Sequence, residues 1–544
     1  MQRIRMRALG AVFISLWLVL NLWAEPHAIR LNSLGYYPSA AKVATVAVGD
    51  AIEYSIVNVE DGETVFHGNL TPLGAEHPEL SVADFTELVT EGNYQLRVGD
   101  HASGAFRIAS DVYTDAFRTV VRAMYLWRCG TAVEGEHNGE VFQHAACHLE
   151  DGYMDYVTGK HEYRYSLGGW HDAGDYNKYV SNAGITVFSM LRAWEEFQEQ
   201  VETVELNLPE KGGPIPELLA EVKWELDWVL TMQEPDGRVL HKLSTLRFGP
   251  FINPEDEKEP RYFTPWGSTS TANFVGMMAM AARIYEPYDA RFAERCLVAA
   301  LKSYDYLVQH PDYVPANMEG FHTGPYESPD ADDRLWAAAE LWVTTGQASI
   351  LADVESRIRA DAMQFDTDFD WGNLRNLGLI AYVFAERDGR NPELVEALQQ
   401  DLIAAADRIV QTAQAHPYSR PLGDRYYWGC NGTVARQLHV LQSAMRVQAK
   451  AEYEHVSLDA IHHLFGRNVH GRSYVTGLGF RPPQHPHDRR IAEDGVDAPW
   501  PGYLVGGANP TAQDWLDEIG SYRTNEIAIN WNGALIYALA AVLR

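Results

Sequence analysis

The hydrophobic pattern changes near Tyr113, and this change limits the possible folds more than any other feature of the 544-residue chain. Residues 27–108 contain short β-branched or alternating segments, such as 43–48, that are separated by turn dipeptides. Strands at this regular spacing predict a β-sandwich, which we assign to residues 25–110. Beyond Tyr113, apolar residues recur at every third or fourth position, which is the period of a helix buried on one face.

The helical pattern extends over residues 111–544 and predicts about ten to twelve helices. Its clearest segments are 272–284, 335–342, 377–384, 402–413, 434–447 and 527–543. No short consensus repeat is visible, which favours a closed toroid of helical hairpins over an open solenoid. Long loops rich in proline, glycine and aromatic residues join the helices, and such loops usually carry function.

Three arginines precede an apolar run over residues 8–23, and Ala24 follows this run. The arrangement predicts an export signal peptide, 1–24, with an uncleaved anchor as the alternative. We therefore expect an exported protein, in the periplasm or the medium, with no membrane segment after signal removal. The formal charge of −30 excludes nucleic acid as a partner, because a polyphosphate needs a basic face. The sequence carries no signal for an oligomeric state.

Two aspartates in the segment 168–179 are the first candidates for catalysis. Asp172 and Asp175 lie three residues apart with Gly174 between them, and glycines favour an irregular turn that aims both carboxylates into one cleft. Two such acids cannot both ionise freely, so one can hold a water that the other deprotonates. An ordinary aspartate-rich turn or a calcium loop is the alternative.

A glutamate near the C-terminus is the third candidate acid. Glu526 stands before the apolar run of the last helix, where a low dielectric raises its pKa and lets it carry a proton at neutral pH. Tyr522 and Asn525 can hydrogen-bond this acid or a substrate. The alternative is a glutamate that only favours the helix N-terminus through the macrodipole.

Two cysteines and two histidines form a possible metal set. Cys129, Cys147, His148 and His171 offer two thiolates and two imidazoles, which suit tetrahedral Zn²⁺. Four protein ligands leave no open position, so the metal would be structural rather than the centre of a zinc-dependent hydrolase. Their dispersed spacing leaves a Cys129–Cys147 disulfide as an equal alternative in an exported protein.

A proline-stiffened loop over residues 482–490 concentrates polar side chains. His485, His487, Asp488 and Arg489 can bind sugar hydroxyls or a charged substituent, and a solvated charged loop is the alternative.

Taken together, these segments resemble glycoside hydrolase family 9, in its subgroup with an N-terminal immunoglobulin-like domain. The shared motifs are GGWHDAGDYNKY (168–179), KWELDW (223–228), STSTA (268–272), WGCNG (428–432), SYVTG (473–477) and TNEIAINWN (524–532). The resemblance implies a mainly α chain, with an (α/α)6 barrel behind an immunoglobulin-like β-sandwich. It also implies inverting cleavage of β-1,4-glucosidic bonds in cellulose, soluble β-glucans or cello-oligosaccharides, by endo or exo attack.

The same resemblance assigns roles to individual residues. Glu526 falls on the general acid, Asp175 on the general base, and Asp172 on the aspartate that helps hold the attacking water. The four cysteine and histidine residues look like zinc ligands, and calcium in the barrel loops is expected without assigned ligands. The candidates for sugar stacking or contact in loops, each of which can instead be a packing residue, are Trp371, Tyr426, Trp428 and Tyr522.

One position departs from the family pattern. Asp488 stands where the family commonly has the second of two adjacent histidines, and it can pair with a substrate ammonium group or merely reorient Arg489. Pairing with an ammonium group would suit an exo-β-D-glucosaminidase acting on chitosan oligosaccharides, which is the alternative activity. A non-catalytic carbohydrate-binding protein is the alternative of another class.

Overall fold

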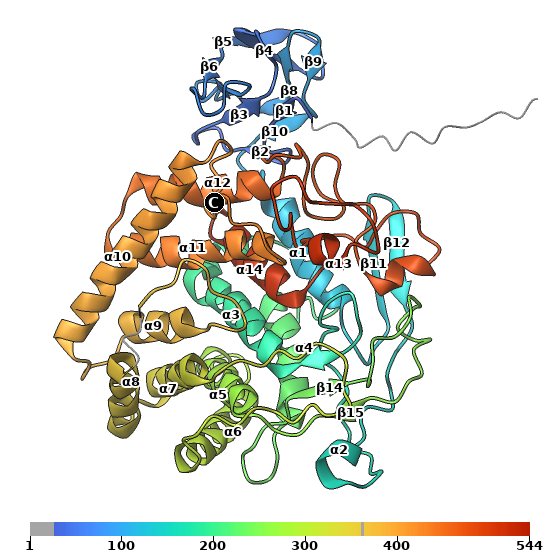
Figure 1. Ribbon diagram of the computed structural model, residues 1–544, viewed down its shortest axis with the longest axis vertical. Coiled ribbons are helices and arrows are strands. Elements are labelled where there is room, and N and C mark those ends of the chain that lie inside the picture. The colour runs from blue at the N-terminus through green and yellow to red at the C-terminus, as the bar shows by residue number, and fades with distance from the viewer. Residues whose placement is uncertain (1–26, 361–363) are drawn as a thin grey trace, which may run out of the picture.

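The computed structural model describes residues 27–360 and 364–544 (Figure 1). The predicted signal peptide, 1–24, lies outside the described residues. Within the two described ranges, no helix combines the length and apolarity needed to cross a membrane.

Residues 29–108 form two β-sheets around an apolar core of their own. One sheet has the order β1-β3-β7-β6, and the other has the order β2-β10-β8-β4-β5 with β9 paired to β8. In β8, Tyr94, Leu96 and Val98 are buried while the residues between them are more exposed, as expected for a strand with one core face. The strands are β1 (Ile29–Arg30), β2 (Gly35–Tyr36), β3 (Val43–Val46), β4 (Glu53–Asn58), β5 (Thr64–Asn69), β6 (Thr71–Pro72), β7 (Ser81–Asp84), β8 (Gly92–Val98), β9 (His101–Ala102) and β10 (Phe106–Ile108).

The remaining residues form a double ring of helices, so the predicted (α/α)6 barrel and immunoglobulin-like sandwich are confirmed. In the inner ring α3 packs on α5, α5 on α7, α7 on α9, and α14 on both α11 and α3. The inner helices are α3 (Val180–Glu202), α5 (Ser268–Ile284), α7 (Ala331–Thr345), α9 (Arg375–Phe384), α11 (Cys430–Val447) and α14 (Ile529–Ala540). The outer helices are α1 (Thr114–Leu126), α4 (Glu217–Thr231), α6 (Ala290–Gln309), α8 (Ala348–Ala360), α10 (Pro392–Ala415) and α12 (Ala451–Leu464).

Burial explains which helices are inside. Every residue of α14 is buried and most of them are apolar, whereas α6 buries one stripe that includes Phe292 and Cys296 and exposes its charged face. Short elements decorate the loops between the helices. They are β11 (Val133–His137), β12 (Glu140–His144), α2 (Asp155–Thr158), β13 (Lys178–Tyr179), β14 (Lys242–Ser244), β15 (Tyr262–Phe263), the 3₁₀ helix η1 (Arg489–Ala492) and α13 (Tyr522–Asn525).

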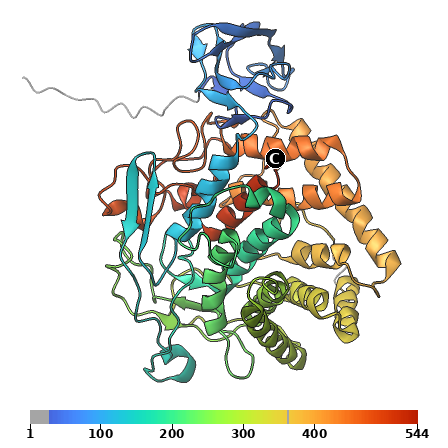
Figure 2. The ribbon, with the colours of Figure 1, turned by 180° about the vertical axis from the view of Figure 1, so that it is seen from behind.

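The sandwich is fixed to one side of the barrel, next to α12 and the C-terminus (Figures 1 and 2). The Ser33 amide donates to the Phe465 carbonyl at 3.0 Å, and the Tyr37 hydroxyl donates to the Val542 carbonyl at 2.7 Å. β10 ends at Ile108 and α1 begins at Thr114. The predicted domain boundary after residue 110 falls between these elements and stays a prediction.

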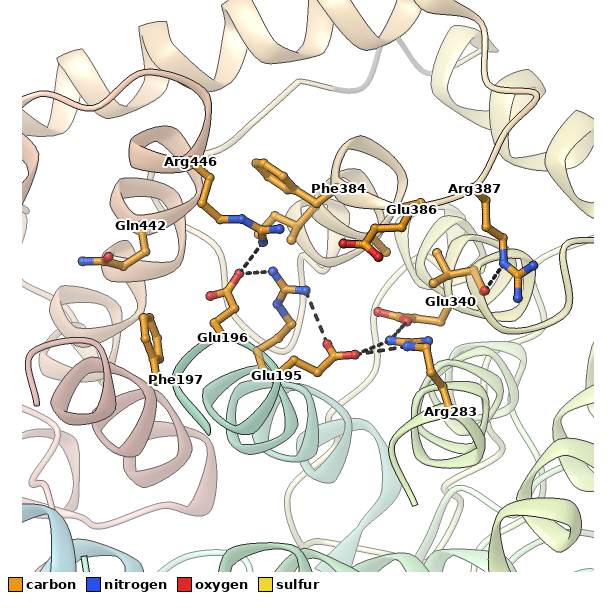
Figure 3. A pocket seen from close by; sticks show the side chains of 15 residues that line it. Glu195, Glu196, Phe197, Arg283, Glu340, Phe384, Glu386, Arg387, Gln442 and Arg446 are labelled. Atoms are coloured by element: carbon orange, nitrogen blue, oxygen red, sulfur yellow. Dashed lines mark hydrogen bonds and ion pairs between the residues drawn. The ribbon is translucent and has the colours of Figure 1, made fainter. Parts of the chain in front are cut away.

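An ion-pair network lies at the end of the barrel where the inner helices terminate. It lines a cavity of about 780 Å³ (Figure 3). Arg283 of α5 binds Glu195 of α3 at 2.9 Å and Glu340 of α7 at 3.0 Å. Glu196 of α3 pairs with Arg192 and, at 2.8 Å, with Arg446 of α11. Because these pairs join four of the six inner helices, we infer that they hold the ring closed.

This network gives a stability prediction. Replacing Glu196, whose side chain is 7% exposed, by alanine removes the partner of Arg446 and leaves Arg192 only Glu195, at 3.4 Å, so we expect the free energy of unfolding to fall by about 2 kcal/mol. Glu386→Ala is the matched control, because Glu386 lines the same cavity but is exposed and makes no ion pair among the described residues. Urea unfolding measures both variants, and equal losses would contradict the inference.

Candidate active site

The loop before α3 holds its aspartates in place through a tryptophan and two buried glutamates. The Trp170 amide donates to Glu225 at 2.6 Å, and its indole N–H donates to Glu221 at 2.8 Å. Gly169, with φ +77°, lies so close to Trp228 that an added Cβ would meet that ring at 2.9 Å. The outer helix α4 therefore sets the position of the residues that follow, which include Asp172.

Asp172 is buried, and each of its oxygens accepts a hydrogen bond. Asn182 of α3 donates to Oδ1 at 2.7 Å, and the Tyr326 hydroxyl donates to Oδ2 at 2.8 Å. Tyr326 has φ +42°, a left-handed conformation that a bulky residue adopts only when its surroundings enforce it. Sequence reasoning missed both partners.

Asp175 is buried on the same loop and is held by its own neighbours. Its Oδ2 accepts from the Asn177 side chain at 2.6 Å and from the Tyr179 hydroxyl at 3.2 Å. Both donors belong to the motif over 168–179, so the motif could have suggested them as partners.

Glu526 lies between α13 and α14 and is half-buried. Its backbone bridges to His487, and its carbonyl accepts from the Gly506 amide at 2.9 Å. Three residues later, the Ile529 amide donates to the Asp172 carbonyl at 2.9 Å. This hydrogen bond joins the beginning of the last inner helix to the loop that carries the aspartates.

Burial raises the pKa of all three carboxyl groups, and neighbouring acids add to the rise for Asp172 and Glu526. Burial, followed by the charge of Asp175, raises the pKa of Asp172 to about 8. Burial also raises the pKa of Asp175, against the opposing charge of Arg489. Burial, then Asp175 and then Asp172, raise the pKa of Glu526 well above its usual range. The structure thus brings the three predicted acids within electrostatic reach of one another, where burial disfavours their ionised forms.

The predicted aromatic contacts separate into two groups. Trp371 meets Tyr326 edge-on with ring centroids 5.0 Å apart, and Trp428, which is 48% exposed, meets Tyr522 edge-on at 5.4 Å. Trp371 therefore lies beside the tyrosine that binds Asp172, and Trp428 lies beside Glu526, whose pKa it lowers. Tyr426 is instead half-buried beneath the Arg420 guanidinium, 4.2 Å from its ring, which favours the packing alternative.

The predicted substrate-binding residues of the loop over 482–490 differ in how close they lie to the three acids. Arg489 is buried and donates to the Gly174 carbonyl at 2.6 Å, which places its charge beside Asp175. His487 donates through Nδ1 to the Ile519 carbonyl at 2.6 Å and packs edge-on against Phe251. The His485 side chain is exposed and makes no hydrogen bond within the described residues.

The Asp488 carboxylate is held by Arg490, which disfavours pairing with a substrate ammonium group, one of the two roles that the sequence leaves open. Its residue is 1% exposed, and its oxygens accept from the Arg490 guanidinium at 2.6 and 3.0 Å. The cause is the burial of Arg490, which needs a counter-charge. The argument for glucosamine specificity loses its structural basis.

The four predicted metal ligands come together from three separate segments. One ligand atom from each of Cys129, Cys147, His148 and His171 lies within 4.8 Å of all the others. Both cysteines are free thiols, so the disulfide alternative is not formed. His148 contacts Glu257 at 3.1 Å, and Arg261 donates to the Cys129 sulfur at 3.1 Å. The set is compatible with a buried four-coordinate metal.

Comparisons with known proteins agree with this arrangement. Residues 113–539 match the profile of glycosyl hydrolase family 9, and residues 24–103 match the cellulase N-terminal Ig-like domain. Endoglucanase D of Acetivibrio thermocellus is 52% identical over 518 residues, which cover 94% of this chain and 83% of the relative.

Solved structures match nearly as much of the chain. A metagenome-derived family 9 endoglucanase superposes with a TM-score of 0.88 at 33% identity, covering 94% of this chain and 98% of that one. A Zn-binding triple mutant of the family 9 endoglucanase J30 superposes with a TM-score of 0.87 at 32% identity, covering 93% and 99%.

Proposed function

Because this chain belongs to glycosyl hydrolase family 9, we propose that it hydrolyses β-1,4-glucosidic bonds with inversion at the anomeric carbon. The proposed substrates are cellulose, soluble β-glucans and cello-oligosaccharides, and endo attack is favoured by the name of the relative from A. thermocellus. The observation that carries the proposal is that Asp172, Asp175 and Glu526 lie within electrostatic reach of one another.

Each acid has a separate role in the proposed reaction. Glu526, kept protonated by its raised pKa, donates its proton to the leaving glycosidic oxygen. Asp175 accepts a proton from the water that attacks the opposite face of the sugar. Asp172, fixed by Asn182 and Tyr326, orients that water. The exposed ring of Trp428, with Tyr522 beside it, offers an apolar face to the sugar.

The first prediction from the proposed function tests Glu526 as the general acid. Glu526→Gln cannot donate the proton, so we expect kcat on cellohexaose to fall by about 10²- to 10⁴-fold. Glu518→Gln, an exposed glutamate in the preceding loop, is the control and should keep full activity. NMR of the first product should show the α-anomer.

Three results separate the alternatives. Full activity of Glu526→Gln, or a β-anomer, would contradict the proposed mechanism. Faster turnover of chitosan hexamer than of cellohexaose would restore the glucosaminidase alternative. Binding without any product from the unaltered protein would indicate a carbohydrate-binding protein.

The second prediction concerns pH. Arg489 lowers the pKa of both Asp175 and Glu526, so Arg489→Gln should raise both values. The base must be ionised and the acid protonated, and therefore both limbs of the pH profile of kcat/KM should move upward, by about one pH unit. Arg489→Lys retains the charge and should shift much less. Limbs that stay in place, or move in opposite directions, would contradict the assigned roles.

We also propose that the cysteine and histidine cluster holds a structural Zn²⁺. Two thiolates balance the charge of the ion, and four protein ligands complete a tetrahedral shell. The ion would tie the end of α1 and the segment after β12 to the loop that bears Asp172. Among the described residues no second cluster of this kind is found, and the expected calcium stays a prediction without ligands.

The third prediction tests this metal. Metal analysis of the purified protein should find a single zinc ion per chain, and Cys147→Ser should lose it and unfold at lower temperature. Cys296→Ser is the control, because Cys296 is a buried free thiol outside the cluster. Zinc that persists in Cys147→Ser would refute the ligand set.

Export to the periplasm or the medium is the proposed location. It rests on the sequence pattern of residues 1–24.

A further inference from the structure

Four tyrosines around α2 form a surface that the proposed reaction does not use. We define the tyrosine platform as Tyr153, Tyr156, Tyr163 and Tyr262. Ring centroids lie 6.1 Å apart for Tyr153 and Tyr163, 6.1 Å for Tyr153 and Tyr262, and 5.4 Å for Tyr156 and Tyr262. Tyr163 is 51% exposed and Tyr156 is 38% exposed, so large apolar faces meet solvent.

The platform is rigid because its backbone is hydrogen-bonded from three segments. The Tyr153 amide donates to the Arg261 carbonyl at 2.9 Å, and the Tyr153 carbonyl accepts from the Phe263 amide at 3.0 Å. The Met154 amide donates to the Glu162 carbonyl at 2.9 Å, which holds the segment that carries Tyr163. A ring array fixed in this way loses little conformational entropy when it binds a ligand.

The platform is connected to the candidate active site. Buried Phe321 supports Tyr156, with centroids 4.8 Å apart, and belongs to the same loop as Tyr326, the hydrogen-bond donor to Asp172. β15, which carries Tyr262, belongs to the sheet β13-β14-β15. Figure 1 shows α2 and β15 on the loop-rich side of the barrel that also carries α13.

We propose that the tyrosine platform binds a segment of a β-1,4-linked glucan chain outside the site of hydrolysis. This inference rests on the proposed function. Flat sugar faces suit exposed aromatic rings, and none of the four hydroxyls has a hydrogen-bond partner within the described residues, so they are available to sugar hydroxyls. A neutral polymer also suits a chain of formal charge −30, which repels polyanions.

His161 limits how much of Tyr153 a ligand can contact. It stacks on Tyr153 at 4.5 Å with an interplanar angle of 6°, which covers one face of that ring. Tyr156 and Tyr163 are therefore the two rings that present most surface to a ligand, and they are the residues to replace.

The test measures binding without turnover. In the Glu526→Gln background, Tyr156→Ala with Tyr163→Ala should bind amorphous cellulose about tenfold more weakly than the parent, in depletion isotherms and in gels containing hydroxyethylcellulose. Tyr163→Trp alone, which keeps an aromatic face, should bind as the parent does. Thermal melting checks that each variant is folded, and the single variant Tyr163→Ala serves if the double variant is not.

The outcomes distinguish this inference from the proposed function. Undiminished binding by a folded alanine variant overturns the platform while leaving hydrolysis by the unaltered protein untouched. A change of oligomeric state in sedimentation, with binding preserved, also overturns it and assigns the surface to a second copy of the chain. Loss of binding in a protein that never hydrolyses β-1,4-glucans would support the platform and refute the proposed function.

Discussion

The inner ring of the barrel consists of helices that run in the same direction, and this constraint determines where chemistry can occur. The segment before each inner helix opens on one face, and the candidate residues follow that rule. Asp172 and Asp175 precede α3, Tyr326 precedes α7, and Glu526 precedes α14. Residues distant in sequence therefore meet because their helices begin on the same side, just as open α/β sheets gather site residues at the carboxyl ends of their strands.

The two ends of the ring differ in whether their carboxyl groups have arginine partners. At the C-terminal ends, Glu196 and Glu340 are each paired with an arginine. At the N-terminal ends, Asp175 and Glu526 share the charge of Arg489, and burial prevails, so the pKa values of these two acids and of Asp172 rise. Helix N-termini favour anions by about 0.3–1 kcal/mol, which is too little to offset the desolvation of three neighbouring acids. Opposite charges are thus paired at one end of the ring, and at the other end burial raises the pKa of the acids.

The sequence predicted the β-sandwich, most of the inner helices and the three acids. The hydrophobic period, the spacing of the acids and the motifs around them can each be recognised within a short segment. It did not predict Tyr326, since no pattern relates a tyrosine in an irregular loop to an aspartate on another segment. It missed Glu221 and Glu225 because glutamates on a helix ordinarily face water, whereas these are buried against Trp170. It left two roles open for Asp488, because the charge of a residue is visible in sequence and the burial of its partner Arg490 is not. Tertiary burial is the information that the pattern lacks.

Closure of the ring depends on its last inner helix, α14. Its first inner helix, α3, packs directly against its last, α14, and the amide of Ile529 binds the carbonyl of Asp172. The circle cannot close before α14 has been synthesised. Under the proposed mechanism, a nascent polypeptide would hold its two aspartates without Glu526 until α14 docks.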